Sequence, residues 1–195
     1  GMIKTFARLD RIDIDSQTVY VLDNLSRQNL SLYSKETVLK LLCDFYTRLS
    51  YDTKDVNESI KYLKMAESID NEIRIAAKCN RLHRLATLNY NQNNFQEALK
   101  YSEEKLHLEE SYHIYKMLSY EEVGFINKNL GNYDKSLEYY EKAFQLISNE
   151  QEEKRLIERL NRLKIYVDLD VDNIMDSWRE KYRIVSDVSK QIKED

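Results

Sequence analysis

Glycine and proline are almost missing from this chain. Its 195 residues include 3 glycines and no proline, whereas average usage of about 7% Gly and about 5% Pro would supply about 14 and about 10. Folds with many tight turns, positive φ angles or rigid corners need these residues, so β-sandwiches, β-barrels and glycine-rich nucleotide loops are excluded. The sequence therefore predicts an almost wholly helical protein.

The charge and hydropathy of the sequence exclude some classes of binding partner. The 30 Lys+Arg against 34 Asp+Glu give a net charge of -4, which argues against the broad basic surface of a nucleic-acid-binding protein. No apolar run approaches the roughly 20 residues of a membrane helix, and no secretory signal opens the chain. We therefore expect a cytoplasmic protein that binds neither nucleic acid nor membrane, with Cys43 and Cys79 as reduced, packed thiols.

One segment recurs along the sequence. The stretch GNYDKSLEYYEKA at 131–143 returns in weaker form as NNFQEALKY at 93–101 and as KDVNESIKY at 54–62, with starts 38 or 39 residues apart. This pattern resembles the tetratricopeptide repeat, whose unit is a pair of antiparallel helices, A and B. The resemblance implies an all-α superhelix, a solenoid of such helix pairs. It covers residues 40–72, 79–110 and 117–149.

The residue types suit two crossing helices. Small residues are expected where helices A and B approach most closely, and these positions are Thr47, Ala86 and Gly124 on A and Ser59, Ala98 and Ser136 on B. Apolar residues three apart form an inner stripe on each A helix. The predicted core positions are Cys43 and Tyr46, Leu82 and Leu85, and Tyr120 and Val123.

The two ends are expected to act as caps, because each end of a solenoid would otherwise expose an apolar face. We predict degenerate capping helices over residues 2–39, and a degenerate repeat with a capping helix over 150–195. Within the latter, a helix over 153–167 and a turn at 168–172 precede a long helix with Met175 and Trp178 at helical spacing.

Motifs that carry chemistry are scarce. The only pattern that resembles a metal site is a pair of Glu-x-x-His steps, Glu104 with His107 and Glu110 with His113. The two steps lie six residues apart, which turns a helix by about 240° and places them on different faces. Surface histidines are therefore favoured over a metal site. We predict a protein that is not an enzyme and has no metal and no cofactor.

Two basic stripes have helical spacing. The first contains Arg74, Lys78, Arg81 and Arg84, and the second contains Arg155, Arg159 and Arg162. For the second, a solvated face balanced by Glu152, Glu153 and Glu158 is favoured over an anion site. The first stripe is less compensated and is the better candidate for contact with a partner.

The resemblance implies that the A helices line a concave groove that binds peptides. The groove positions that it predicts are Asp44, Arg48, Asn80, His83, Arg84, Thr87, Asn91, Glu121, Phe125 and Asn129. Asp44 and Glu121 stand where the clamp for a partner's terminal carboxylate needs cations, which disfavours an adaptor for chaperone tails. The amides of Asn80, Asn91 and Asn129 are suited to reading a peptide backbone.

Two functions fit this sequence. The first is a non-enzymatic module that holds a protein or peptide segment in the groove; a homodimer is compatible with it. The alternative is the peptide-sensing repeat domain of a bacterial transcriptional regulator, because long repeats rich in Asn, Tyr and Lys resemble the peptide-pheromone-sensing regulators of Gram-positive bacteria. On that alternative, the DNA-binding domain is absent from this chain.

Overall fold

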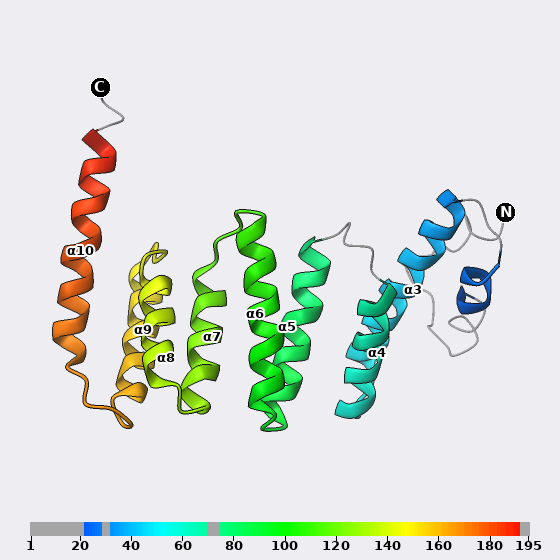
Figure 1. Cartoon of the computed structure of the whole chain (residues 1–195), viewed down its shortest axis with the longest axis horizontal. Helices are drawn as coiled ribbons and strands as arrows, with labels where there is room; N and C mark the ends of the chain where they lie inside the picture. Colours follow the sequence, from blue (N-terminus) through cyan, green and yellow to red (C-terminus); the bar gives the residue numbers. More distant parts are fainter. Residues whose placement is uncertain (1–21, 29–31, 70–74, 192–195) are drawn as a thin grey trace. The chain divides into compact units, whose positions relative to one another are not determined.

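The computed structural model of the chain describes residues 22–28, 32–69 and 75–191, so most of the predicted N-terminal cap and Arg74 lie outside the described residues. Every regular element within those ranges is an α-helix, which confirms the predicted all-α fold class (Figure 1). The helices with defined bounds are α3 (Leu32–Asp52), α4 (Val56–Ile69), α5 (Ile75–Asn91), α6 (Phe95–Ser111), α7 (Met117–Asn129), α8 (Tyr133–Phe144), α9 (Glu150–Leu163) and α10 (Val171–Gln191).

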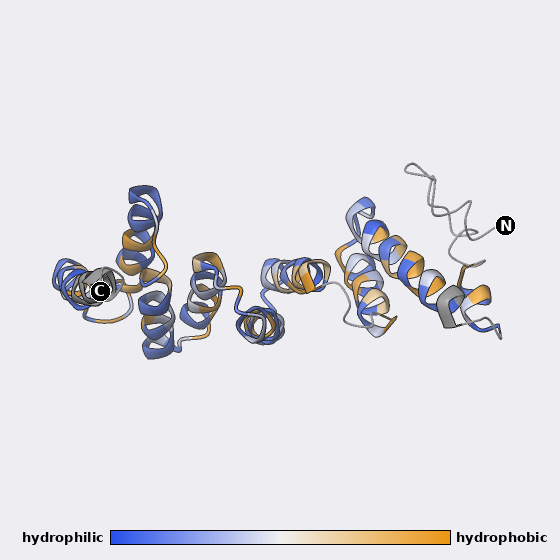
Figure 2. Cartoon of the chain, turned by 90° about the horizontal axis from the view of Figure 1, so that it is seen from above, coloured by the Kyte–Doolittle hydropathy of each residue, from blue (hydrophilic) through white to orange (hydrophobic). Residues whose placement is uncertain are grey.

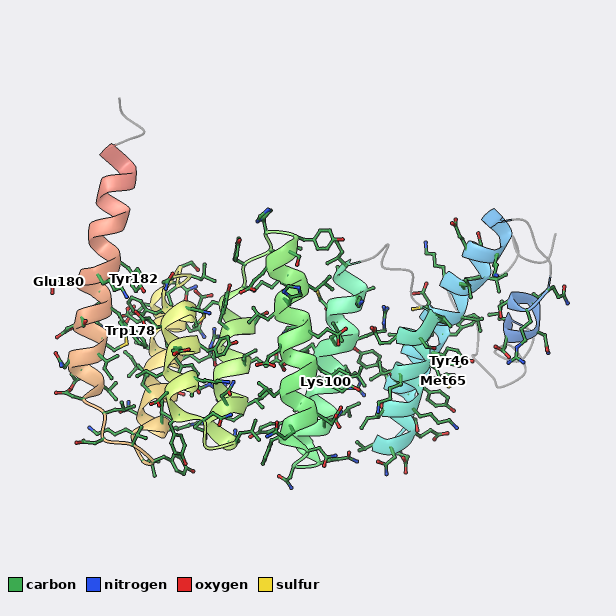
Figure 3. The ribbon with its side chains drawn as sticks, in the orientation of Figure 1. Tyr46, Met65, Lys100, Trp178, Glu180 and Tyr182 are labelled. Atoms are coloured by element: carbon green, nitrogen blue, oxygen red, sulfur yellow. The ribbon has the colours of Figure 1, made fainter. Side chains whose placement is uncertain are left out.

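The chain divides into two compact units within α5. Unit 1 ends at Leu88 and unit 2 begins at Asn89. In unit 1, α3 and α4 pack as an antiparallel pair, and their buried residues form one core with Leu22. Figure 3 shows Tyr46 and Met65 between these two helices. At the crossing, the Ser59 hydroxyl donates to the Ser50 carbonyl at 2.6 Å, so a small polar residue lets the two backbones approach.

Two turns of unit 2, one between α5 and α6 and one between α7 and α8, have the same geometry. Asn93 between α5 and α6 has φ 61°, and Gly131 between α7 and α8 has φ 79°. Glycine adopts this left-handed conformation at no steric cost, and Asn does so at a lower cost than most residues. After the first turn, Asn94 donates its backbone N–H to the Asn89 carbonyl, and after the second, Asn132 donates to the Asn127 carbonyl, at 2.9 Å in both cases. The hairpins therefore close where the repeat register predicts.

The predicted inner stripes and small crossing residues are buried with one exception. Cys43, Tyr46, Leu82, Leu85, Tyr120 and Val123 all belong to the core, as do Ala86, Ala98, Ser59, Ser136 and Gly124. Thr47 is half-buried instead, and its hydroxyl donates to the carbonyl of Cys43 on the preceding turn of the same helix. This local hydrogen bond satisfies the hydroxyl within α3.

The core of unit 2 continues through the last two helices. Leu156, Leu160 and Leu163 of α9 are fully buried, and Met175 and Trp178 of α10 pack into the same cluster, as their spacing predicts. Figure 3 shows Trp178 and Tyr182 directed from α10 toward its neighbours, where both rings contact Phe144 of α8. The α-helix predicted over 153–167 is α9, which begins and ends a few residues earlier, at Glu150 and Leu163.

A reciprocal cap accounts for the early start of α9. The Asn149 side chain accepts from the Glu152 backbone N–H at 3.0 Å, and the Glu152 carboxylate accepts from the Ser148 backbone N–H at 2.9 Å. Such a pair satisfies two N–H groups that a helix end leaves without partners. The hydrogen bond from the Ser148 backbone also lowers the pKa of Glu152.

Unit 2 has two sides. Seen from above (Figure 2), α7 and α9 lie on one side, and α6 and α8 lie on the other. Helices α7 and α9 are the first members of the pairs α7–α8 and α9–α10, and they contact each other. The side chains of α7 and α9 that point away from α8 therefore form one continuous surface.

Candidate functional site

Unit 1 holds six of the predicted groove positions. Arg84 is half-buried and fixed: its guanidinium carbon lies 4.2 Å from the centre of the Tyr51 ring, and its Nη2 donates to the Ser50 carbonyl at 3.1 Å. Arg84 thus joins α5 to the end of α3. Asp44 is half-buried as well, and the exposed positions are Arg48, Asn80, His83 and Thr87.

Arg81, one residue of the first basic stripe, does not lie on an exposed surface. Arg81 is 1% exposed, and its Nε lies 2.6 Å from a carboxylate oxygen of Glu67 on α4. A buried, paired guanidinium holds helices together and is withdrawn from partners. The interpretation of this stripe as a contact surface is therefore wrong at Arg81, because the carboxylate that compensates the charge comes from a different helix.

In unit 2, the predicted groove residue Glu121 organises the second basic stripe. Its side chain is 3% exposed; one oxygen lies 2.8 Å from Arg155 Nε and the other lies 2.7 Å from Arg159 Nε. Burial strengthens such charged hydrogen bonds, because solvent does not screen them. Glu121 on α7 therefore fixes two arginines of α9 in place and does not itself face solvent.

Phe125 is the centre of an aromatic and cationic cluster one turn further along α7. The Arg159 guanidinium carbon lies 4.4 Å from the Phe125 ring centre, and Lys128 Nζ lies 5.0 Å from it. The Tyr90 ring, from the end of α5, lies 5.3 Å from the same ring. These distances are within the range of cation–π and ring–ring attraction.

Tyr166, just beyond α9, extends this cluster. Lys128 Nζ lies 5.6 Å from the Tyr166 ring centre, and that ring stacks on Tyr133 at 5.5 Å while remaining 56% exposed. Together these residues make up a surface that we call the cationic A face. It consists of Phe125, Lys128 and Asn129 from α7 and Arg159, Arg162 and Tyr166 from α9 and the turn after it.

The cations of this face repel one another. Burial lowers the pKa of Lys128, and the nearby charges of Arg162 and Arg159 lower it further. Within the part of the chain that the structure describes, neither Lys128 nor Arg162 makes an ion pair, and Glu158 does not reach Arg162. The face is therefore locally positive on a chain whose net charge is -4.

Residues 119–150 match the family model for the tetratricopeptide repeat. The chain therefore contains a segment similar to a tetratricopeptide repeat, within an all-helical structure. The matched segment contains nearly all of α7, the whole of α8 and the first residue of α9. Repeats of this type are generally non-catalytic modules for protein interaction. Comparison with curated proteins gives no match.

The remaining predicted groove positions of unit 2 are Asn129 and Asn91. Asn129 is half-buried, and its side-chain amide donates to the Phe125 carbonyl at 2.8 Å. Asn91 is exposed at the end of α5. In unit 2 the structure thus brings Phe125 and Asn129 together on α7, above the buried carboxylate of Glu121.

Sequence reasoning missed three contributors to the cluster. Lys128 follows Phe125 by three residues and Tyr166 follows Arg159 by seven, so helical spacing was a usable signal for both. Tyr90 gave no such signal, because its contact with Phe125 depends on how the end of α5 meets α7. The predicted partners of the second stripe were also wrong in part: Arg155 and Arg159 pair with Glu121, and Glu153 pairs with Arg179 of α10.

A buried ion pair joins α6, the second helix of the second predicted repeat, to α7. Lys105, 6% exposed on α6, places its Nζ 2.6 Å from a carboxylate oxygen of Glu122 on α7. The Ser102 hydroxyl donates to the other oxygen of that carboxylate at 2.7 Å. The long side chain of Lys105 thus joins α6 to α7.

The residues of the Glu-x-x-His steps have other contacts. The Glu110 carboxylate accepts from the Tyr120 hydroxyl at 2.9 Å, and His113 lies beyond α6 with φ 55°, next to the Tyr115 ring. In the ranges that the structure covers, no group of three His, Cys, Asp or Glu side chains could hold a metal ion. Over the same ranges, no helix is both long and apolar enough to cross a membrane.

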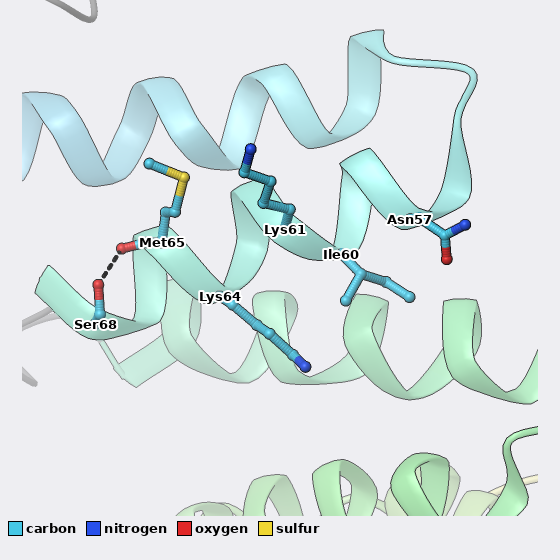
Figure 4. A pocket seen from close by; sticks show the side chains of 6 residues that line it. All are labelled: Asn57, Ile60, Lys61, Lys64, Met65 and Ser68. Atoms are coloured by element: carbon cyan, nitrogen blue, oxygen red, sulfur yellow. Dashed lines mark hydrogen bonds between the residues drawn. The ribbon is translucent and has the colours of Figure 1, made fainter.

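Two hollows lie away from the cationic A face. One, of about 430 Å³, runs along α4; Figure 4 shows that α4 alone supplies all six lining side chains, with Ile60 and Lys64 pointing to one side and Lys61 and Met65 to the other. A single helix offers no convergent set of groups. The other has a volume of about 230 Å³ and lies between α6 and α8. Its lining residues are Glu103, Leu106, His107, Glu110, Tyr139 and Lys142.

Proposed function

We propose that this protein is a non-enzymatic interaction module that binds a peptide or protein segment on the cationic A face of unit 2. The observation that supports it most is the cluster around Phe125, in which Arg159 and Lys128 lie against an aromatic ring. Aromatic residues and arginine are enriched at protein interfaces and among the residues that dominate binding energy.

The face is also organised before any partner arrives. Glu121 holds Arg159 at 2.7 Å, and Tyr133 supports the exposed ring of Tyr166. Ordering an arginine or a tyrosine on binding costs conformational entropy, about 0.5–1.5 kcal/mol for each side chain that is immobilised. Side chains that are already fixed avoid most of that cost. The arrangement therefore favours binding at this position.

The chemistry of the face favours binding over catalysis. Its side chains are aromatic rings, guanidinium and ammonium groups, and an amide. A general base needs a carboxylate, a neutral histidine or a thiolate in reach of the substrate, and the carboxylate that contacts Arg159 of this face, that of Glu121, is buried between two arginines. The sensory-domain alternative stays a prediction, because it concerns a DNA-binding domain outside this chain.

Selection of displayed peptides on the whole chain tests the proposal. We expect selected peptides to bind wild type, and Tyr166→Ala and Phe125→Ala to weaken their binding by about tenfold or more. Tyr112→Ala is the matched control, because Tyr112 is also an exposed aromatic residue but lies beyond α6, outside the face. Thermal melting of each variant separates lost binding from lost folding, and Tyr166→Ala removes little packing.

Two results would contradict the proposal. One is equal affinity of wild type and Tyr166→Ala for every selected peptide. The other is a loss with Tyr112→Ala as large as the loss with the two variants of the face. Either result would place the binding surface elsewhere on the chain.

A further inference from the structure

We infer that the segment held on the cationic A face is an acidic peptide, whose side-chain carboxylates are bound by Lys128 and Arg162. This inference rests on the proposed function and specifies the chemistry of its partner. It comes from the balance of charge on α7 and α9, from the rings beside those charges, and from the charge of the rest of the chain.

The first observation is the balance of charge along α7 and α9. Four cationic side chains, Lys128, Arg155, Arg159 and Arg162, lie along α7 and α9; the Glu121 carboxylate contacts Arg155 and Arg159, and Lys128 lies near Arg159 and Arg162. Two of them, Arg155 and Arg159, are held by that carboxylate. Lys128 and Arg162 are left without an anion among the residues described, so the site has room for negative charge from outside the chain.

Three other cations of unit 2 each contact a carboxylate on a neighbouring helix. Lys105 pairs with Glu122, Lys181 with Glu141 at 2.7 Å, and Arg179 with Glu153 at 2.6 Å. Each of these pairs joins two different helices. Lys128 of α7, by contrast, lies near two cations of α9, and its pKa is lowered by burial and by Arg162 and Arg159. An anion bound between them would relieve that repulsion.

The aromatic rings beside Lys128 indicate which other side chains the bound peptide carries. Phe125 and Tyr166 lie within 5.0 Å and 5.6 Å of Lys128 Nζ, so a carboxylate at Lys128 places the neighbouring residues of the same segment over an aromatic surface. Apolar side chains gain from burial there, by roughly 25 cal/mol per Å² of apolar area. The preferred segment therefore alternates acidic residues with apolar ones.

The overall charge favours a short peptide over a nucleic acid. The chain carries a net charge of -4, and the unpaired cations that we identify are two side chains on one face. A nucleic acid presents a charge about every 3.4 Å along each strand and draws its affinity from many phosphate contacts. Beyond this small face it would meet a chain whose net charge is negative, whereas an acidic peptide of a few residues would contact the face alone.

The test compares two labelled peptides of about a dozen residues, one in which Glu alternates with Leu and Ser, and one in which every Glu is replaced by Gln. Fluorescence anisotropy with the full chain is expected to give at least about tenfold tighter binding of the Glu peptide at low salt, with the difference decreasing as salt increases. The double variant Lys128→Gln/Arg162→Gln is expected to remove that preference.

Lys154→Gln is the matched control for the single variants Lys128→Gln and Arg162→Gln, because each removes one positive charge. Lys154 lies on α9, is exposed and pairs with Glu150, and it is about 140° around the helix from Arg159, so it is off the face. It should leave the affinity for the Glu peptide unchanged. An equal loss with Lys154→Gln would show that only the net charge of the chain matters, and would overturn the inference.

Two further outcomes would overturn it as well. One is equal affinity for the Glu and Gln peptides; the other is a single-stranded oligothymidylate that binds more tightly than the Glu peptide and loses affinity in the double variant. A different result separates this inference from the proposed function. If uncharged selected peptides bind the chain and lose affinity in Tyr166→Ala, the cationic A face binds peptides, and only the inference that these peptides are acidic is wrong.

Discussion

The ring of Tyr140 occupies the space that a side chain at Gly124 would need. A Cβ atom built on Gly124 would lie 2.7 Å from Cε1 of Tyr140 and 3.2 Å from the backbone oxygen of Ser136. Tyr140 is fully buried, so its ring is enclosed by neighbouring residues and cannot move aside into solvent. The absence of a side chain at position 124 therefore sets how closely α7 and α8 approach.

We predict that Gly124→Ala destabilises the protein. Alanine favours a helix over glycine by about 1 kcal/mol, but overpacking a closed core costs about 1 to 3 kcal/mol, and a contact of 2.7 Å forces a shift of the Tyr140 ring. Urea unfolding should show a lower midpoint. Tyr140→Leu in the Gly124→Ala background should cost less than the sum of the two single changes. A midpoint at or above that of wild type would contradict the close approach.

The turn at Gly131 yields a second prediction. Its φ of 79° is matched by 61° at Asn93 in the preceding hairpin, so Asn is a residue that this turn already accommodates. We expect Gly131→Asn to cost less than about 1 kcal/mol, and Gly131→Val to cost more than the Asn variant because a branched side chain is strained at positive φ. No atom lies within 4 Å of a Cβ at Gly131, so any difference reflects the backbone alone. Equal midpoints for the two variants would count against this explanation.

The buried pair of Lys105 and Glu122 is expected to be strongly coupled. Removing one member of such a pair leaves the other charge uncompensated, so we predict a loss of about 3 kcal/mol for Lys105→Met and a similar loss for Glu122→Gln. The double variant should lose less than the sum, because neither buried charge remains. A double-mutant cycle by chemical denaturation measures the coupling. Strict additivity would show that the 2.6 Å contact contributes nothing.

Tyr140 links stability to alkaline pH. Burial raises its pKa to about 12 from the ordinary value of 10.0. The folded state therefore favours the neutral phenol, a contribution that is complete below pH 10 and is lost as the pH rises toward about 12. A difference of that size corresponds to about 3 kcal/mol.

Tyr140→Phe should remove this part of the alkaline loss. At pH 7 the variant should be as stable as wild type or more so, because the buried Tyr140 hydroxyl makes no hydrogen bond of ordinary geometry to a residue that the structure describes. Denaturation at pH 7 and at about pH 11 in both proteins gives the comparison. Tyr120 and Tyr139 also have raised pKa values, so the expected result is the difference between the two proteins. If wild type and Tyr140→Phe lose the same free energy of unfolding between pH 7 and about pH 11, the assignment to Tyr140 is wrong.

Much of the fold follows from local sequence patterns. Gly131 and Asn93 predict the hairpin turns because they share a register and tolerate positive φ, and the apolar stripe of Tyr120 and Val123 predicts which face of α7 is buried. These features depend on residues a few positions apart. The reciprocal cap at Asn149 and Glu152 is local as well, but it was overlooked, which explains the late predicted start of α9.

The candidate site depends on contacts that are distant in sequence. Arg155 and Arg159 meet Glu121 across 34 and 38 residues, so helical spacing revealed the stripe but could not identify its partner. The same limit applies to Arg81, whose charge is neutralised by Glu67 on a separate helix. Charges paired within one helix can be predicted from spacing, whereas those paired between helices require the packing angle.

The most direct measurement for the central claim is NMR mapping of the isotope-labelled chain during titration with a peptide selected on it. We predict that the largest shift changes occur at Phe125, Lys128, Arg159 and Arg162, on the cationic A face. Changes confined to Glu103, His107 and Tyr139, which line the hollow between α6 and α8, would contradict the account.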